Sequence, residues 1–401
     1  MLETERLTLR QFTPDDVENL VELDSDPQVM RYITGGRATP REEIEREELP
    51  AFMSGSGFWA AVEKATGDFI GWFHLRPRAD GAADEPELGY RLQRSAWGKG
   101  YATEGSRALI EKAFADLGAE RVWAETMVVH TASHRVMEKA GLKYVRTFHA
   151  DWPYKIDGDE EGDVEYALTR AEWEERRDLV RLAARNNAEW CDAFCRTHGI
   201  AGHFDEDAWW CAERTPPLYP DAVTLVPGVD SASLLARIDD GAGCSIKDSF
   251  GDLDLARDGF EVLFRAAWLR LTVVHGHEPA WTSIRSADEL AKWETAWGEA
   301  RGAQFFRPAL LADDSIEILA RYDGDRIAAG AVANRSVGAI GLSNVFDEPD
   351  DLEAAYLGGA RAARERWGPQ PVVGYDSGAG LDAARRAGFV SHGELAVWVR
   401  T

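Results

Sequence analysis

The chain has 401 residues and a formal net charge of −25 at pH 7, and 45% of its residues are hydrophobic. This length allows two domains of ordinary size. The acidic balance disfavours nucleic acid and anionic membranes as partners, and it favours cationic ligands such as amines. No apolar run approaches the ~20 residues that cross a bilayer, and the N-terminus lacks a basic and then apolar leader. We therefore expect a soluble, cytoplasmic protein, whose oligomeric state the sequence leaves open.

The first half of the chain, residues 1–175, has the pattern of one α/β domain. A capping hydroxyl, a proline and two acids at Thr13-Pro14-Asp15-Asp16 predict a helix start, and Ala65-Thr66-Gly67-Asp68 is typical of a hairpin turn. Alternating apolar residues predict strands, and apolar residues at helical spacing predict helices. In chain order the strands are expected at 6–10, 58–63, 69–75, 87–93, 121–128, 144–148 and 164–169, and the later helices at 101–117 and 132–140.

The segment Trp97-Gly98-Lys99-Gly100-Tyr101-Ala102-Thr103-Glu104 lies between a predicted strand and an amphipathic helix. Two glycines let a backbone approach a ligand closely, and the start of the helix directs its free N–H groups and its positive dipole end at an anion. The segment lacks the third glycine of the dinucleotide pattern GxGxxG and the GxxxxGK of a P-loop. The sequence therefore predicts a phosphate-binding turn of another kind.

Trp97 through Ala102 resembles the acetyl-CoA pyrophosphate loop of the GCN5-related N-acetyltransferases, the GNAT superfamily, with Trp97 in place of the usual glutamine or arginine. The whole segment is similar to the RimJ/RimL-like branch, which acetylates ribosomal-protein N-termini. Three further segments resemble family motifs in the expected order, namely 4–10 (TERLTLR), 87–90 (ELGY) and 133–141 (SHRVMEKAG). The resemblance implies the GNAT fold, a mixed and mostly antiparallel sheet flanked by helices, in which the fourth strand splays from the fifth.

The resemblance also implies where acetyl-CoA would bind, as a co-substrate held in the gap between those two strands. Backbone groups of the fourth strand would contact the pantetheine arm, and the glycine turn would hold the pyrophosphate. For Lys99 a direct phosphate contact and a solvated turn lysine remain alternatives. The expected cofactor-binding residues are Tyr90, Arg91, Leu92, Gln93, Trp97, Gly98, Lys99, Gly100, Tyr101, Ala102, Thr103, His130 and Ser133.

Two residues are candidates for the catalytic chemistry that the resemblance implies. Glu87 is expected to act as the base that deprotonates the acceptor amine, with a solvent-facing strand glutamate as the alternative. Relatives often carry a tyrosine in the second helix that protonates the leaving thiolate, and Met137 occupies that position here. Ser133 is then the candidate hydroxyl near the sulfur, with helix capping as its alternative role. His130 replaces the asparagine of the family and can hydrogen-bond the cofactor or titrate.

The acceptor site is expected beside the segment between the last two strands. Asp157, Asp159, Glu160, Glu161 and Asp163 there form either an acidic rim that attracts a cationic amine or a solvated loop. Trp152 and Tyr154 can wall the site or simply pack. We predict an N-acetyltransferase that acts on a primary amine of a small molecule or peptide N-terminus. The alternatives are another donor, either a different acyl-CoA or an aminoacyl-tRNA, and a non-catalytic acetyl-CoA sensor.

The second domain, residues 176–401, is expected to follow a charged connecting helix at 174–185 and to be a degenerate copy of the first. Its last third repeats the element order, with paired strands at 328–346, a helix at 352–367, a strand at 372–375, a helix at 381–387 and a strand at 389–399. Where the glycine turn would stand, the copy has Asp347-Glu348-Pro349-Asp350-Asp351. These carboxylates would repel a pyrophosphate, so we expect no CoA binding there.

Four cysteines are too few and too unevenly placed for a disulfide scaffold in a chain of this size. Cys191, Cys195 and His198 are spaced to share one face of a helix, with Cys211 and Cys244 further on. Structural zinc ligands are usually closer together and lie in loops or turns. A cysteine-lined core face is therefore favoured over the alternative of a metal site, and we expect no metal.

Overall fold

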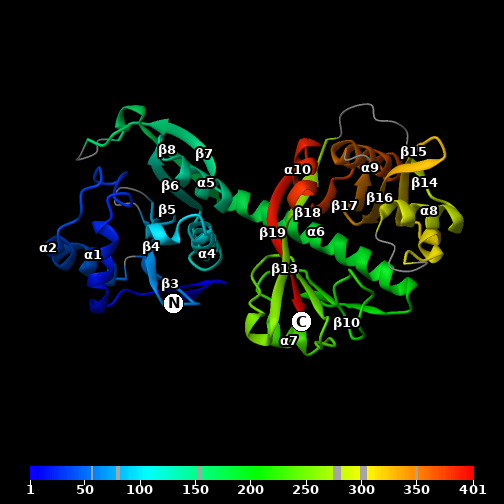
Figure 1. The fold of residues 1–401 in the computed structure, drawn as a ribbon, viewed down its shortest axis with the longest axis horizontal. Coiled ribbons are helices and arrows are strands. Elements are labelled where there is room, and N and C mark those ends of the chain that lie inside the picture. The colour runs from blue at the N-terminus through cyan, green and yellow to red at the C-terminus, as the bar shows by residue number, and fades with distance from the viewer. Residues whose placement is uncertain (56, 78–81, 151–154, 274–280, 299–304, 348–350) are drawn as a thin grey trace. The chain divides into compact units, whose positions relative to one another are not determined.

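The computed structural model describes residues 1–401 apart from 56, 78–81, 151–154, 274–280, 299–304 and 348–350. The chain divides into two compact units, Met1–Glu174 (unit 1) and Glu175–Thr401 (unit 2), shown in Figure 1. The division falls inside the long helix α6 (Arg170–Thr197). Within the described residues, no helix is long and apolar enough to span a membrane.

Unit 1 is built on an eight-stranded sheet with helices on both faces. Its strands are β1 (Leu2–Glu3), β2 (Leu7–Arg10), β3 (Phe58–Glu63), β4 (Phe69–Pro77), β5 (Pro86–Leu92), β6 (Arg121–Met127), β7 (Lys143–Phe148) and β8 (Asp163–Thr169). Its helices are η1 (Pro14–Asp16), α1 (Val17–Ser25), α2 (Arg41–Glu43), η2 (Ile44–Glu48), α3 (Leu49–Met53), η3 (Arg94–Ala96), α4 (Tyr101–Ala115), α5 (Thr131–Ala140) and η4 (Asp159–Glu161). The sheet order is β1-β2-β3-β4-β5-β6-β8-β7, and among the described residues β5 and β6 are its one parallel pair, so the predicted mixed and mostly antiparallel sheet is confirmed.

Alternation along β4 creates the two layers of unit 1. Phe73 is fully buried toward α4 and α5, in a cluster that includes Leu109 and Met137. The preceding residue, Trp72, points to the opposite face and packs with the cluster under α1 and α3, which includes Phe52. Because successive strand residues point to opposite faces, each strand contributes to both cores. The helices at 41–53 were not anticipated by the sequence pattern.

Unit 2 carries an eleven-stranded sheet of order β14-β15-β16-β17-β18-β13-β19-β12-β11-β10-β9. Its strands are β9 (Gly202–Phe204), β10 (Ala208–Cys211), β11 (Ala222–Thr224), β12 (Ser245–Asp248), β13 (Phe260–Leu271), β14 (Thr282–Ser283), β15 (Ile316–Asp323), β16 (Arg326–Ser336), β17 (Ala339–Asp347), β18 (Val372–Asp376) and β19 (Val390–Arg400). Its helices besides α6 are α7 (Ser231–Leu235), η5 (Ala256–Asp258), α8 (Ala287–Trp297), η6 (Pro308–Ala312), α9 (Leu352–Trp367) and α10 (Gly378–Arg386).

Helix α6 corrects the expectation of a connecting helix at 174–185. It runs for 28 residues, and from Val180 to Cys195 one of its faces is buried in the main core of unit 2. Apolar residues at helical spacing continue past 185, and they bury because the sheet of unit 2 covers them. The helix is therefore an integral core element of unit 2.

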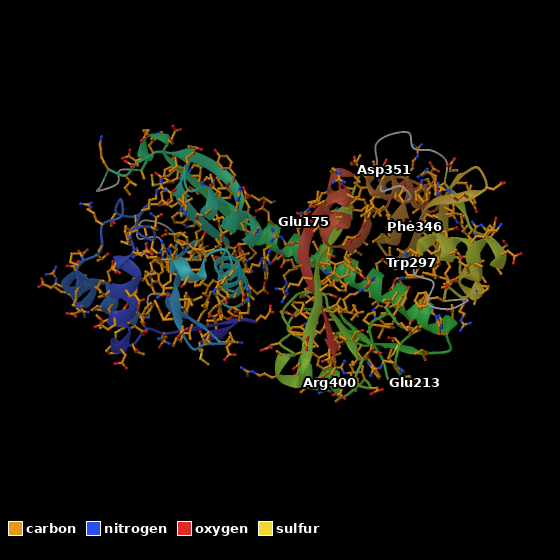
Figure 2. All side chains as sticks on the ribbon, in the orientation of Figure 1. Glu175, Glu213, Trp297, Phe346, Asp351 and Arg400 are labelled. Carbon is orange, nitrogen blue, oxygen red and sulfur yellow. The ribbon has the colours of Figure 1, made fainter. Side chains whose placement is uncertain are left out.

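Aromatic side chains and three of the four cysteines fill this core. Trp293 of α8 lies 5.3 Å from Phe346 of β17 and 6.4 Å from Trp297, ring centre to ring centre, and the latter two are labelled in Figure 2. Cys191 and Cys195 on α6 are buried in the same cluster, as is Cys211. Among the described residues no group of three or more potential ligands is placed to hold a metal ion. The cysteine-lined core face is thus what the structure shows.

Candidate active site

The most open feature of the unit 1 sheet is the junction of β5 and β6. These two strands pair at one position, Glu87 with Trp123, and separate beyond it. The backbone N–H of Gln93 bonds Ile70 O on β4 (2.9 Å), so by alternation the backbone groups of Arg91 and Gln93 face β4. Those of Tyr90 and Leu92 face the opening. Of the four backbone contacts expected for the pantetheine arm, the expectation for Arg91 and Gln93 is therefore corrected.

The glycine turn lies at the start of α4, at the end of this opening. Gly98 and Gly100 have φ angles of +74° and +87°, which other residues adopt only under strain. Gly100 is the N-cap of α4, and no side chain caps that helix. A Cβ added to Gly98 would meet nothing within 4 Å. The first amides of α4 thus have no side-chain cap among the described residues, and a helix N-terminus of this kind can bind an anion.

A network from the N-terminal segment holds this turn in place. Glu104 Oε1 accepts hydrogen bonds from Thr4 Oγ1 (2.6 Å) and the Arg6 backbone N–H (2.8 Å), and the Arg6 guanidinium pairs with Oε2 (2.6 Å). Arg6 Nη1 also donates to the backbone oxygen of Lys99 (2.9 Å). The residues at 4–10 and 97–104 are thus parts of one structure. Their sequence separation concealed this contact, because nothing local relates position 6 to position 104.

Two aromatic residues complete the turn. Trp97 is 48% exposed, and its indole N–H donates to Leu92 O (2.9 Å), so this carbonyl already has a partner where β5 ends. Tyr101 is buried, its hydroxyl bonds the carboxylate of Glu63, and the Arg6 guanidinium lies 4.6 Å from its ring centre. Trp97 therefore ties the turn to β5, and Tyr101 ties the first turn of α4 to β3. Lys99 is exposed.

Glu87 lies where β5 and β6 part, and its side chain is 19% exposed. Its Oε2 is 3.3 Å from the Arg76 guanidinium, and its Oε1 is 3.9 Å from His74 Nε2. Burial, with smaller contributions from Arg76 and Arg91, lowers the pKa of His74 to about 3, so this imidazole is neutral at pH 7. Glu87 is thus a partly shielded carboxylate beside one cation, rather than a fully solvated strand residue.

Ser133 and Tyr90 meet on the other face of β5. The Tyr90 hydroxyl lies 2.9 Å from Ser133 Oγ, and burial raises the pKa of Tyr90 to about 12. No side chain caps α5, so the expected alternative of Ser133 as a helix cap is wrong. Met137, in the position where relatives carry a tyrosine, is 1% exposed and belongs to the core.

His130 immediately precedes α5. Its Nδ1 lies 3.1 Å from Thr126 Oγ1, and its ring stacks on Tyr32 at 4.2 Å between ring centres. Burial, with smaller contributions from His134 and Arg31, lowers the pKa of His130 to about 4. The imidazole is therefore neutral at physiological pH, and the expectation that it can titrate there is wrong.

The expected acidic rim is only partly available. Asp157 and Glu160 are exposed, whereas Asp163 is buried at the start of β8. Gly158 lies against Val129, which precedes α5, so η4 lies beside the site. The residues Trp152 and Tyr154 lie outside the described part of the chain.

The face of β5 toward α1 holds charged residues that the sequence pattern did not connect. Arg91 pairs with the buried Asp24 of α1 (2.6 Å), and Thr39 donates to the same carboxylate (2.6 Å). The Arg91 side chain therefore ties β5 to α1.

The comparisons with known proteins concern the region of this site. The family model described as an acetyltransferase (GNAT) domain matches residues 6–143. FsC-acetyl coenzyme A-N(2)-transacetylase of Aspergillus fumigatus is 36% identical over 43% of this chain and 77% of its own length. The uncharacterized protein YkkB of Bacillus subtilis is 32% identical over 36% of this chain and 87% of its own length.

Solved structures show a weaker likeness. A GNAT-family acetyltransferase from Bacillus anthracis is 24% identical, covers 42% of this chain and 98% of its own, and has a TM-score of 0.38. The family model and the two sequence relatives carry the assignment. The chain belongs to the GNAT family of N-acetyltransferases.

Proposed function

We propose that unit 1 transfers an acetyl group from acetyl-CoA to a primary amine by direct attack in a ternary complex. The observation that carries this proposal is the opening between β5 and β6, with a carboxylate where the strands part and an uncapped helix N-terminus at its end. The name of the Aspergillus relative, FsC-acetyl coenzyme A-N(2)-transacetylase, supports the same donor and the same type of acceptor atom.

In this proposal the glycine turn holds the pyrophosphate of acetyl-CoA. Backbone N–H groups at the start of α4 donate to the phosphate oxygens, and the helix dipole favours their charge. The Tyr90 and Leu92 backbone faces the pantetheine arm, and neutral His130 serves as a hydrogen-bonding group. The residues proposed to line this site are Tyr90, Leu92, Trp97, Gly98, Lys99, Gly100, Tyr101, Ala102, Thr103, His130 and Ser133.

Glu87 is proposed as the base. The amine reaches the carbonyl carbon only as a free base, so its proton passes to the carboxylate directly or through one water. The Arg76 guanidinium lies 3.3 Å from the Glu87 carboxylate, and neutral His74 adds no second positive charge beside it. A positioned carboxylate of this kind contributes about 10²- to 10⁴-fold to rate.

The acceptor is proposed to be a cationic amine of a small molecule or a peptide N-terminus. The acidic segment at η4 beside the site and the net charge of −25 both favour a positively charged acceptor. The Trp97–Glu104 segment supports placement in the RimJ/RimL-like branch.

Unit 2 is proposed to be GNAT-like in fold and unable to bind CoA. Its strands β15 to β18, helices α9 and α10 and strand β19 repeat the order of β3 to β6, α4, α5 and β7. In the sheet, β13 lies between β18 and β19, as β8 lies between β6 and β7. Because β13 precedes the other elements in sequence, this arrangement is a circular permutation of unit 1.

The test uses the full chain, acetyl-CoA and a panel of polyamines, aminoglycosides, amino acids and N-terminal peptides, with release of CoA thiol as the readout. We expect turnover with at least one amine, and Glu87→Gln should lower kcat by about 10²-fold or more with little change in the KM for acetyl-CoA.

Glu85→Gln is the matched control, because Glu85 lies two residues away and pairs with Arg121 (3.3 Å) outside the opening. It should leave the rate unchanged. An unchanged rate for Glu87→Gln at every pH would show that Glu87 is not the base. Background hydrolysis alone with every amine would favour the sensor alternative, and transfer only from another acyl donor would favour that alternative.

A further inference from the structure

The leaving thiolate of CoA needs a hydrogen-bond donor, and the helix position where relatives carry a tyrosine holds a buried methionine. Met137 is 1% exposed and packs in the core, so it has neither a donor nor access to the opening. Ser133 lies one helical turn earlier on α5. An isolated serine hydroxyl is a weak acid, so its orientation decides whether it can serve as a donor.

Tyr90 is the group that orients Ser133. Its hydroxyl lies 2.9 Å from Ser133 Oγ and 3.4 Å from Ser133 O, so the phenol reaches from β5 to the first turn of α5. The backbone of Tyr90 also faces the opening beyond the Glu87–Trp123 pair. The phenol itself lies on the α5 side of the sheet, so it can act on the opening only through Ser133.

The strand geometry separates this pair from the base. Glu87 and Tyr90 are three residues apart on β5, so their side chains point to opposite faces of the sheet. Glu87 lies with His74 and Arg76 on one face, and Tyr90 lies near Phe73 on the other, at 6.0 Å between ring centres. An amine that approaches on the Glu87 face of the sheet leaves the face toward α5 to the CoA sulfur.

We propose that Tyr90 is a positioning residue for the transfer, which donates to Ser133 Oγ so that the Ser133 hydroxyl points its proton at the departing CoA sulfur. This inference rests on the proposed function. In relatives a tyrosine on the second helix assists the leaving thiolate. Here we propose that a tyrosine on strand β5 assists it instead, through the Ser133 hydroxyl.

In the proposed step neither Tyr90 nor Ser133 loses its proton. The ammonium proton has first passed through Glu87 to solvent; the free amine nitrogen then forms a bond to the carbonyl carbon and gives its second proton to Glu87, which releases it to water. The C–S bond breaks, and its electron pair stays on sulfur. The thiolate accepts the Ser133 O–H hydrogen bond, Ser133 Oγ accepts the Tyr90 O–H, and CoA leaves as a thiolate that takes a proton from water. The raised pKa of Tyr90, about 12, is consistent with a phenol that stays protonated as a donor.

A double-mutant cycle on the full chain tests the proposal. Tyr90→Phe should lower kcat about fivefold to tenfold, as expected for one lost hydrogen bond in the transition state, and change the KM for acetyl-CoA less than about twofold. Ser133→Ala should lower kcat further. In the Ser133→Ala background, Tyr90→Phe should have no additional effect, because Tyr90 acts only through that hydroxyl. Ser133→Thr keeps a hydroxyl and should restore most of the rate.

Tyr144→Phe is the matched control, because Tyr144 makes the same kind of bond at the same distance, to Thr147 Oγ1 (2.9 Å), on the exposed strand β7. It should leave kcat unchanged. The proposal is wrong if Tyr90→Phe keeps the parent kcat, or if the Tyr90→Phe and Ser133→Ala effects multiply. Loss of the proposed function would look different, since the parent chain itself would then release no thiol with any amine.

Discussion

The starts of α4 in unit 1 and α9 in unit 2 are built in opposite ways. Helix α4 begins at Gly100, with a left-handed backbone and no side chain on its first amides. The N-cap of helix α9 is Asp351, labelled in Figure 2, and its carboxylate accepts a hydrogen bond from the Ala354 N–H (3.2 Å). Just before it, Asp347 is held by Arg321 at 2.9 and 3.0 Å. Residues Glu348, Pro349 and Asp350 lie outside the described part of the chain.

The difference shows two outcomes at a helix N-terminus. The orphan amides of any helix are satisfied by a side chain, by water or by a ligand. In α9 the protein supplies its own anion, so a phosphate would have to displace a carboxylate. At the start of α4 the carboxylate of Glu104 is paired with Arg6, and that of Glu63 accepts a hydrogen bond from the Tyr101 hydroxyl, so neither caps the first amides. A ligand site therefore depends on leaving a helix end uncapped while its surroundings are held rigid.

Gly100→Asp should give the largest effect, because it places a carboxylate in unit 1 where unit 2 carries one. We expect the KM for acetyl-CoA to rise by about 100-fold or more, which corresponds to ~2.7 kcal/mol of lost binding. Titration calorimetry should show one CoA site in the parent chain and none in the variant. Gly67→Asp controls for strain, since Gly67 has a similar φ of +76° and a Cβ there meets nothing within 4 Å. CoA binding that persists in Gly100→Asp would indicate a CoA site in unit 2. The proposed difference between the two helix starts would then be wrong.

Acid should lower the stability of unit 1 through His130, which precedes α5. Helix α10 of unit 2 has Ser377 at its start and no histidine there. The folded pKa of His130 is about 4, below the ~6.5 of an unfolded histidine, so the unfolded state binds a proton first as the pH falls. This contribution leaves stability intact above pH 6.5 and removes up to about 3 kcal/mol by pH 4. His130→Asn should abolish that component in urea unfolding of unit 1 at pH 7 and pH 4.5. An equal pH dependence of the unfolding free energy in the parent chain and in His130→Asn would contradict this prediction.

Asp351→Ala should have the smallest effect. Loss of an N-cap costs about 1 kcal/mol, so the unfolding free energy of unit 2 should fall by that amount. Asp230→Ala, which removes the cap of α7 (2.8 Å to the Ser233 N–H), should cost a similar amount. CoA stoichiometry should stay at one per chain, because the segment before α9 would still carry the Arg321–Asp347 ion pair and no glycine turn. A second CoA site in Asp351→Ala would show that the cap alone excludes the ligand.

Local pattern predicted most of unit 1. The helix start after Thr13, the strands from β2 to β8 and the glycine turn before α4 all follow from short-range chemistry, and the structure confirms them. Helix α6 was misjudged because its charged first half continues into a face that only the sheet of unit 2 can bury. The helices at 41–53 were missed because they are short and one turn is a π-helix, so no clear periodicity marks them.

The sequence alone determined the family and the place of the glycine turn, because these depend on residue type and local spacing, and the resemblance to the family proposed Glu87 and Ser133. Only the tertiary structure decided that Arg6 holds Glu104, that Tyr90 meets Ser133, and that Arg91 and Gln93 turn their backbones away from the opening. Such contacts join residues 43 or 98 positions apart, or follow from strand register. Register and long-range packing are set by burial of whole strand faces, which no local pattern encodes.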